Sequence, residues 1–251
     1  MRLKLLAAAL TAAAATLTST TSAQAGHSWG SYHWARTANP FTLKLGDNLA
    51  SGWKSYLGTA SNDWSQSSVL NTTVVTGQSN NNCRATSGRV EVCNRTYGNN
   101  GWLGLASISA NGTHITSGTV KVNDTYFNTA TYNSPSWKTL VMCQEVGHTF
   151  GLAHQDEGQT NPNLGTCMDY TNNPDGPPSN LHPNAHDFTQ LESIYAHLDS
   201  TSTVDHSAAV PTVGNSKASW GKRVARSAHG DTYVRDFGKG SKVITFVIWA
   251  G

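Results

Sequence analysis

Charged side chains are scarce in this sequence of 251 residues: Asp, Glu, Lys and Arg make up 13% of it, and the formal net charge is +2. Proteins that bind nucleic acid usually have a strongly basic balance, so no nucleic-acid partner is expected. After the N-terminal run, no apolar stretch approaches the roughly 20 residues that span a bilayer. The mature chain is therefore expected to be soluble and to stay out of membranes.

Cysteine is also scarce, with four residues and no CxxC pair, which argues against a four-cysteine metal site. An even number of cysteines in an exported chain favours two disulfides, and three pairings are open. Cys83 and Cys93 flank a short loop, so pairing them is the simplest arrangement. That choice leaves Cys143 to pair with Cys167.

The N-terminus has the three parts of a secretory signal in their usual order. Residues 1–4 carry Arg and Lys, residues 5–17 are apolar and rich in alanine, and residues 23–25 (Ala-Gln-Ala) have the pattern of a cleavage site. The alternative, a buried N-terminal helix, does not explain this order. We therefore predict a signal peptide over residues 1–25 and a chain that is secreted after cleavage near Ala25.

Hydrophobic periodicity divides the rest of the chain into strands and helices. Residues 26–199 are predicted to form one domain, followed by a polar linker over 200–216 and a small β appendage over 217–251. Residues 242–250 could equally be a core strand that returns to the main sheet. The expected strands are 41–48, 70–77, 89–97, 101–110 and 114–124, and the expected helices are 49–66, 134–150 and 183–198. This order implies an α+β domain with one mixed sheet and helices segregated from it.

One face of the helix predicted over 134–150 combines apolar and polar side chains. The residues on this face, spaced by three and four, are Trp137, Leu140, Val141, Gln144 and His148. Its apolar members indicate that the face points inward. Gln144 and His148 would then be buried one turn apart, and burying each without a partner costs roughly 1–3 kcal/mol. A bound metal ion would satisfy both side chains.

Three further residues complete the pattern of a metal site. Glu145 follows Gln144, where a carboxylate can reach a water on the metal without being a ligand. Gly151 can end the helix in a left-handed turn, which lets His154 return as a third ligand. Three protein ligands that leave a fourth position for water are typical of a catalytic rather than a structural zinc site.

The pattern QExxHxxGxxH over residues 144–154 resembles HExxHxxGxxH, which together with a downstream Met-turn marks the metzincin zinc endopeptidases. Residues 167–170 (Cys-Met-Asp-Tyr) resemble that Met-turn. The resemblance extends over roughly residues 35–198 in element order and is sharp only at these two motifs. It implies a metzincin-like α+β catalytic domain with a twisted mixed sheet, an active-site helix, a Met-turn and a C-terminal helix, together with the small β appendage.

The resemblance also implies roles for individual residues. Gln144 would replace the first histidine ligand and hold Zn2+ together with His148 and His154. Glu145 would act as the general base that takes a proton from the attacking water. Tyr170 would donate a hydrogen bond to the oxyanion formed in peptide hydrolysis.

The surroundings of the metal are expected to be shaped by the loop after the helix. The resemblance implies that Met168 forms an apolar floor under the metal. It also supports the bridge between Cys143 and Cys167, because such a fold brings the helix and the Met-turn together. Asp156 follows His154 closely and is interpreted either as a substitute ligand or as a hydrogen-bond partner of a ligand histidine.

Gln144 leaves three interpretations open. Its amide oxygen can be a neutral metal ligand that is harder and weaker than imidazole nitrogen. It can instead lie beside a metal held by another side chain, or the site can hold metal poorly and lack catalysis. We predict a secreted, monomeric zinc endopeptidase with protein or peptide substrates. The alternatives are a metzincin-fold pseudoprotease that acts by binding and a glycan-binding module, suggested by the eight tryptophans.

Other histidines are interpreted without a role in the reaction. His182 and His186 have the spacing of neighbours on a helix and could form a second metal site, but we interpret them as surface residues. His114 begins a predicted strand and is interpreted as structural.

Overall fold

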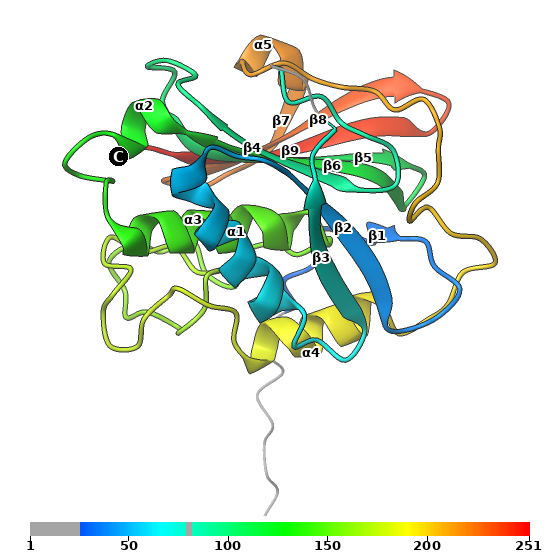
Figure 1. The fold of residues 1–251 in the computed structure, drawn as a ribbon, viewed down its shortest axis with the longest axis horizontal. Helices are drawn as coiled ribbons and strands as arrows, with labels where there is room; N and C mark the ends of the chain where they lie inside the picture. The colour runs from blue at the N-terminus through cyan, green and yellow to red at the C-terminus, as the bar shows by residue number, and fades with distance from the viewer. Residues whose placement is uncertain (1–25, 79–81) are drawn as a thin grey trace, which may run out of the picture.

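A nine-stranded sheet runs through the protein in this computed structural model, which describes residues 26–78 and 82–251 (Figure 1). The predicted signal peptide lies outside the described residues. The order in the sheet is β3-β2-β4-β6-β5-β9-β8-β7, and β1 pairs with the start of β6. The strands are β1 (His33–Trp34), β2 (Phe41–Asn48), β3 (Leu70–Thr76), β4 (Val90–Arg95), β5 (Trp102–Asn111), β6 (His114–Asn123), β7 (Lys222–Arg226), β8 (Gly230–Gly238) and β9 (Ser241–Trp249).

The sheet is mixed, as the sequence predicts. Strands β1, β2, β3, β4 and β6 pair in parallel, whereas β5 runs antiparallel to β6 and begins an antiparallel part that continues through β9, β8 and β7. Strands and helices are segregated, so the α+β fold class is confirmed.

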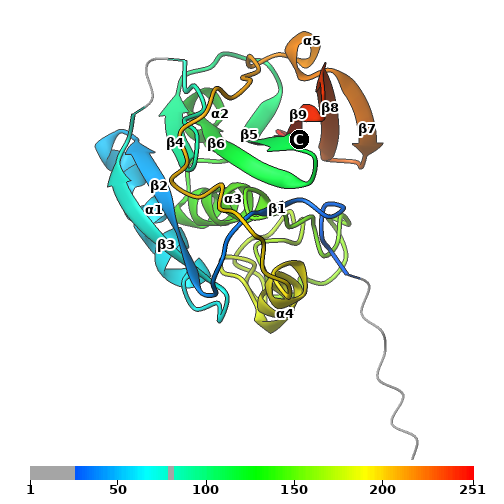
Figure 2. The same cartoon turned by 90° about the vertical axis from the view of Figure 1, so that its right-hand side faces the viewer.

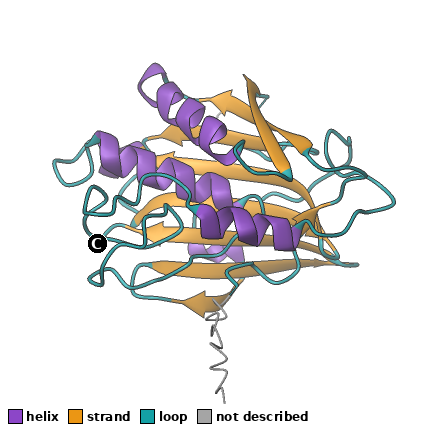
Figure 3. Cartoon of the chain, turned by 90° about the horizontal axis from the view of Figure 1, so that it is seen from below, coloured by secondary structure: helices purple, strands orange, loops and turns teal. Residues whose placement is uncertain are grey.

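The longer helices cover one face of the sheet, and a short helix lies on the other (Figures 2 and 3). The helices are α1 (Ser51–Trp64), α2 (Asp124–Phe127), α3 (Pro135–His148), α4 (Ala185–Ile194) and α5 (Lys217–Trp220). The main core lies between the sheet and α1, α3 and α4, and α5 covers a smaller cluster on the opposite face. Within the described part of the chain, none of the helices is both long and apolar enough to cross a membrane.

The tail is part of the main sheet, because β9 pairs with β5 along the whole of β5. Phe246 and Ile248 of β9 face the main core, and Val247 faces the smaller cluster. A strand that is apolar on both faces needs cover on both faces, which a separate appendage could not supply. The alternative left open by the sequence, a returning core strand, is therefore what the structure contains. Strands β8 and β9 are called the C-terminal hairpin below.

The segment expected as a linker is held against the sheet. Backbone hydrogen bonds join Thr203 to Ala35 and Asp205 to Gly88. Elements β1, α2, α5 and β7 were not predicted, because runs of two to five residues are too short to show a periodicity.

Candidate active site

Helix α3 lies close to the span predicted for it. The Ser134 side chain accepts a hydrogen bond in the first turn, and Pro135 is the first helical residue. The helix ends at His148, and Gly151 then adopts a φ of +96°. A Cβ at Gly151 would lie 2.3 Å from the carbonyl oxygen of Tyr32, so this left-handed turn requires glycine. The turn reverses the chain toward the end of α3.

His148 and His154 face each other through their Nε2 atoms, which are 3.0 Å apart. Nδ1 of His148 lies 2.8 Å from the carbonyl oxygen of Leu152, which can only accept, so this Nδ1 carries the hydrogen. Nδ1 of His154 lies 3.3 Å from Oε1 of Glu157, and the hydrogen bond from His154 lowers the pKa of that carboxyl. The carboxylate of Glu157 therefore accepts as well. With both Nδ1 atoms protonated, each neutral ring directs a lone pair at the other.

Two lone pairs at this distance repel each other unless a cation lies between the two nitrogens. Burial lowers the pKa of His148 well below its ordinary value, so a proton on its Nε2 is disfavoured. A metal ion between the two nitrogens would accept both lone pairs and remove the repulsion. Histidine ligands usually donate their second ring nitrogen to a carbonyl or a carboxylate, which is the arrangement of both rings here.

Gln144 and Glu145 lie within one turn of His148, and their exposed fractions are 0% and 1%. Nε2 of Gln144 donates to the carbonyl oxygen of Cys167 at 2.9 Å, which fixes the orientation of the amide because a carbonyl can only accept. Oε1 of Gln144 and Oε2 of Glu145 are buried without a hydrogen-bond partner among the described residues. Unpaired acceptors of this kind cost roughly 1–3 kcal/mol each, and a metal ion with its water would satisfy them.

Strand β5 passes close to Glu145 at Gly104. A Cβ at position 104 would lie 2.4 Å from Oε1 of Glu145 and 2.8 Å from Cγ1 of Val141 on the same helix. Burial raises the pKa of the Glu145 carboxyl well above its ordinary value. A carboxyl group that is perturbed in this way is common at catalytic sites, although structural networks also produce it.

The Met-turn is linked to α3 by a disulfide and to Gln155 by a backbone hydrogen bond. The predicted disulfide joins Cys143 to Cys167. Met168 is fully buried, and a Cβ at Gly147 would lie 2.7 Å from its sulfur. The Met168 carbonyl accepts a hydrogen bond from the Gln155 backbone at 2.7 Å. The Met-turn therefore packs against α3 one residue before His148 and is hydrogen-bonded one residue after His154.

Tyr170 packs on His154, with ring centroids 4.2 Å apart. A Cβ at Gly230 would lie 1.8 Å from its hydroxyl oxygen, so the hydroxyl points at the first residue of β8. Burial raises the pKa of Tyr170 well above its ordinary value, and the Glu145 charge adds to this. The hydroxyl is thus close to the predicted base but is occupied by the tail of the chain.

Asp156 is held by the loop that follows it, and its role as a substitute ligand stays a prediction. Its Oδ1 accepts hydrogen bonds from the backbone of Gly158 at 2.6 Å and from Asn161 at 2.9 Å, which holds the following loop. Glu157, the next residue, pairs with His154 instead. The carboxylate that contacts a histidine of the motif is therefore that of Glu157, because Asp156 is engaged within its own loop, as Asp side chains in turns often are.

The C-terminal hairpin covers His148. The ring of Phe246 on β9 stacks flat on the ring of His148, with centroids 4.5 Å apart and an interplanar angle of 6°. Trp29 meets the ring of Phe246 edge-on, with centroids 5.4 Å apart. Together with Gly230 over Tyr170, these contacts close the site in this conformation.

Several outcomes concern residues away from the two motifs. The second predicted disulfide, Cys83–Cys93, is present. His182 pairs with Asp63, and His186 stacks on His27. These two histidines therefore contact different residues. The contacts of Glu157 with His154 and of Phe246 with His148 were not predicted from the sequence. The spacing of Glu157 three residues after His154 was a usable signal, but nothing local marks Phe246.

Comparisons with known proteins identify no family. No protein-family model matches the chain, and no curated protein matches its sequence. Among solved structures, myroilysin is 15% identical with a TM-score of 0.40, covering 68% of this chain and 99% of that one. High choriolytic enzyme 1, a hatching enzyme zinc-protease from Oryzias latipes (Medaka fish), is 12% identical with a TM-score of 0.36, covering 66% of this chain and 95% of that one. Likenesses this loose carry no weight for the function, which has to be argued from the residues themselves.

Proposed function

We propose that this protein is a zinc-dependent endopeptidase whose metal is held by Gln144, His148 and His154. The observation that carries the proposal is the pair of Nε2 lone pairs that face each other at 3.0 Å, with both Nδ1 atoms already used as donors. A sequence that needed only a folded core would not be expected to hold two imidazoles in this way. Imidazole and amide oxygen are both neutral ligands that zinc accepts.

Gln144 is proposed as a direct ligand. Its NH2 group is committed to the carbonyl of Cys167, which leaves Oε1 as a buried acceptor with no partner among the described residues. The disulfide at Cys143 holds the same turn of the helix against the Met-turn, so the amide has little freedom to rotate away. The expected cost of the substitution is a weaker affinity for zinc, since an amide oxygen is a harder donor than imidazole.

The bound zinc would supply a water of lowered pKa and would polarise the scissile carbonyl group. Glu145 is proposed to take the proton of the attacking water and to deliver it to the leaving amine. Gly104 leaves the room in which its carboxylate lies. Tyr170 is proposed to donate to the oxyanion, for which its hydroxyl has to leave its present place against Gly230.

A substrate can reach these residues only after the C-terminal hairpin has moved. Gln144, Glu145 and His148 are at most 1% exposed, and Phe246 lies flat on His148. The protein is therefore proposed to be latent in this conformation. The same observation favours a second candidate function, a metal-binding pseudoprotease that acts by binding. Export after cleavage near Ala25, protein or peptide substrates and a monomeric state remain proposals.

The test is made on the chain that begins at Gly26, with metal content and casein cleavage measured for the wild type and for Phe246→Ala. We expect zinc at the histidine pair and chelator-sensitive cleavage that is stronger in Phe246→Ala and lost when Glu145→Gln is added. Zinc without cleavage in either chain would favour the pseudoprotease. Absence of zinc in both would exclude both candidates.

The role of Gln144 has its own test. Gln144→His should tighten zinc binding if residue 144 is a ligand, because imidazole is the better donor. Gln66→His, at an exposed glutamine, is the matched control for the new histidine. Equal affinities in the two variants would show that another side chain supplies the third ligand.

A further inference from the structure

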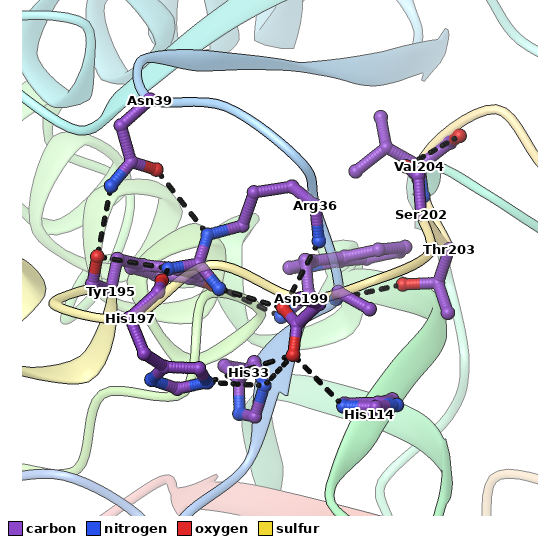
Figure 4. Close-up of polar contacts among 12 residues, drawn as sticks. His33, Arg36, Asn39, His114, Tyr195, His197, Asp199, Ser202, Thr203 and Val204 are labelled. Carbon is purple, nitrogen blue, oxygen red and sulfur yellow. Dashed lines mark hydrogen bonds and ion pairs between the residues drawn. The ribbon is translucent and has the colours of Figure 1, made fainter.

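Three histidines converge on one aspartate, Asp199 (Figure 4). His33 lies on β1, His114 begins β6, and His197 and Asp199 follow α4. Oδ1 of Asp199 is 3.4 Å from Nε2 of His33, 3.2 Å from Nε2 of His114 and 3.6 Å from Nε2 of His197. Nε2 of His197 is 3.2 Å from Nε2 of His33. None of these residues belongs to the candidate active site.

The tautomer of His33 is fixed by its backbone. Its Nδ1 lies 2.8 Å from the carbonyl oxygen of Ser31, so Nδ1 carries the hydrogen and Nε2 bears a lone pair. That lone pair is directed at the carboxylate oxygen of Asp199 and at the ring nitrogen of His197. His33 is only 5% exposed, so water cannot easily separate these groups. A metal ion at this point would accept the lone pair of His33 and be neutralised in part by the carboxylate.

Asp199 is held so that one oxygen is free for such a cation. Its Oδ2 accepts from Nη1 of Arg36 at 2.8 Å and from the Arg36 backbone at 3.2 Å. Arg36 itself is anchored by the Tyr195 carbonyl at 2.8 Å and by the His197 carbonyl. Arg36 therefore neutralises one oxygen and orients the other toward the imidazoles. The side chain of Asp199 is 9% exposed, so this orientation is built into the fold rather than chosen by solvent.

We propose that His33, His197 and Asp199 bind a divalent transition-metal ion of the zinc class. Their ligand atoms all lie within 4.8 Å of one another. Atoms bound to tetrahedral zinc at about 2.0 Å lie about 3.3 Å apart, close to the separations within this group. Imidazole with carboxylate is a ligand set that zinc and its neighbours in the first transition row prefer to magnesium or calcium. His114 lies beside the set, with its Nε2 against the same carboxylate oxygen.

The ion would join segments that are far apart in the sequence. It would link β1, near the start of the described chain, to the residues just after α4, and β1 in turn pairs with β6. The side chain of His197 is 54% exposed, so the ion can exchange with solvent. An ion that binds the folded chain but not the unfolded chain stabilises the fold according to its concentration and affinity.

The test uses Zn2+ alone, added to the chelator-stripped chain from residue 26, with calorimetric titration and thermal unfolding as readouts. His197→Ala removes an exposed ligand and should fold. It should lower zinc binding by one equivalent and reduce the zinc-dependent rise in the unfolding temperature. His33→Ala should give the same loss. The control is His182→Ala, which removes a histidine that pairs with a single carboxylate, that of Asp63.

The outcome does not depend on the candidate active site. If that site binds zinc, the wild type takes up two equivalents and His197→Ala takes up one; if it does not, the numbers are one and none. The proposal is overturned if both His197→Ala and His33→Ala bind as much zinc as His182→Ala with an unchanged rise in unfolding temperature. In that case the three histidines and Asp199 are joined by hydrogen bonds without a metal ion.

Discussion

Lys121 on β6 is a buried cation, and folding should favour its neutral form. The residue is 4% exposed, and its Nζ donates to Oδ1 of Asn215 at 2.7 Å. Burial lowers the pKa of Lys121 from 10.5 to about 8. Asn215 precedes α5, so this hydrogen bond joins β6 to the segment that leads into the C-terminal hairpin.

The lowered pKa determines the sign of the pH dependence. Below pH 8 the ammonium is charged in both the folded and the unfolded chain, and the folded chain bears the cost of burying it. Between pH 8 and 10.5 the unfolded chain keeps a proton that the folded chain has lost, so the free energy of unfolding rises with pH. A difference of about 2.5 pKa units corresponds to about 3 kcal/mol, of which about 2 kcal/mol is gained between pH 7 and 9.5.

Lys121→Met removes the charge and keeps most of the length of the side chain. Denaturant unfolding of both proteins at a series of pH values gives the difference in the free energy of unfolding, in which groups common to both chains cancel. The value for the wild type minus that for the variant should rise by about 2 kcal/mol from pH 7 to 9.5. At pH 7 the variant should be the more stable one. Removing the buried charge should stabilise it by up to about 3 kcal/mol, and losing the hydrogen bond to Asn215 should cost about 1–2 kcal/mol of that gain.

The control is Lys222→Met, which removes a lysine charge from an exposed position on β7. A Lys121→Met difference that follows the control across the pH range would refute the reasoning, because it would mean that water reaches the ammonium in the folded chain. A variant less stable than the wild type at every pH, with the predicted slope retained, would assign a larger share to the hydrogen bond with Asn215.

Two further predictions concern the candidate active site. Gly104→Ala places a Cβ 2.4 Å from Oε1 of Glu145 and should lower kcat by about a hundredfold, a loss that a displacement of about 1 Å can cause. Gly58→Ala, whose Cβ would meet nothing within 4 Å, is the control, and equal kcat values in the cleavage assay would contradict the assigned base. Phe246→Ala should cost about 3–5 kcal/mol in denaturant unfolding and raise chelator-sensitive cleavage. Phe127→Ala, another buried phenylalanine of the main core, should lose stability without that gain, and a gain in both would assign the effect to general loosening.

The local features of the fold could be predicted because their causes are local. The start of α3 follows from a capping serine and a proline, and the turn at Gly151 follows from a conformation that requires glycine. The mixed sheet followed from the order of strands and helices. The place of β9 could not be decided in advance, because its partner β5 lies more than a hundred residues earlier and the apolar run suits either placement.

The candidate site divides in the same way. The spacing within residues 144–154 predicted which side chains come together, since helix geometry and one turn fix them. Whether Asp156 or Glu157 contacts His154 could not be predicted, because it depends on the hydrogen bonds that Gly158 and Asn161 donate to Asp156. The cover over His148 depends on a phenylalanine that is brought there by strand pairing, so no motif could report it.

Gln144 can be compared directly with His148, the proposed ligand that is unchanged from the metzincin motif. In His148, one ring nitrogen donates to a backbone carbonyl and the other is left as an acceptor. In Gln144, the NH2 group donates to the carbonyl of Cys167 and the amide oxygen is left as an acceptor. The glutamine therefore reproduces the division of donor and acceptor that a ligand histidine needs, with oxygen in place of nitrogen. A substitution that only damaged the site would not be expected to keep both the donor and the acceptor in place. We therefore expect Gln144→His to change the affinity for zinc and not whether zinc binds.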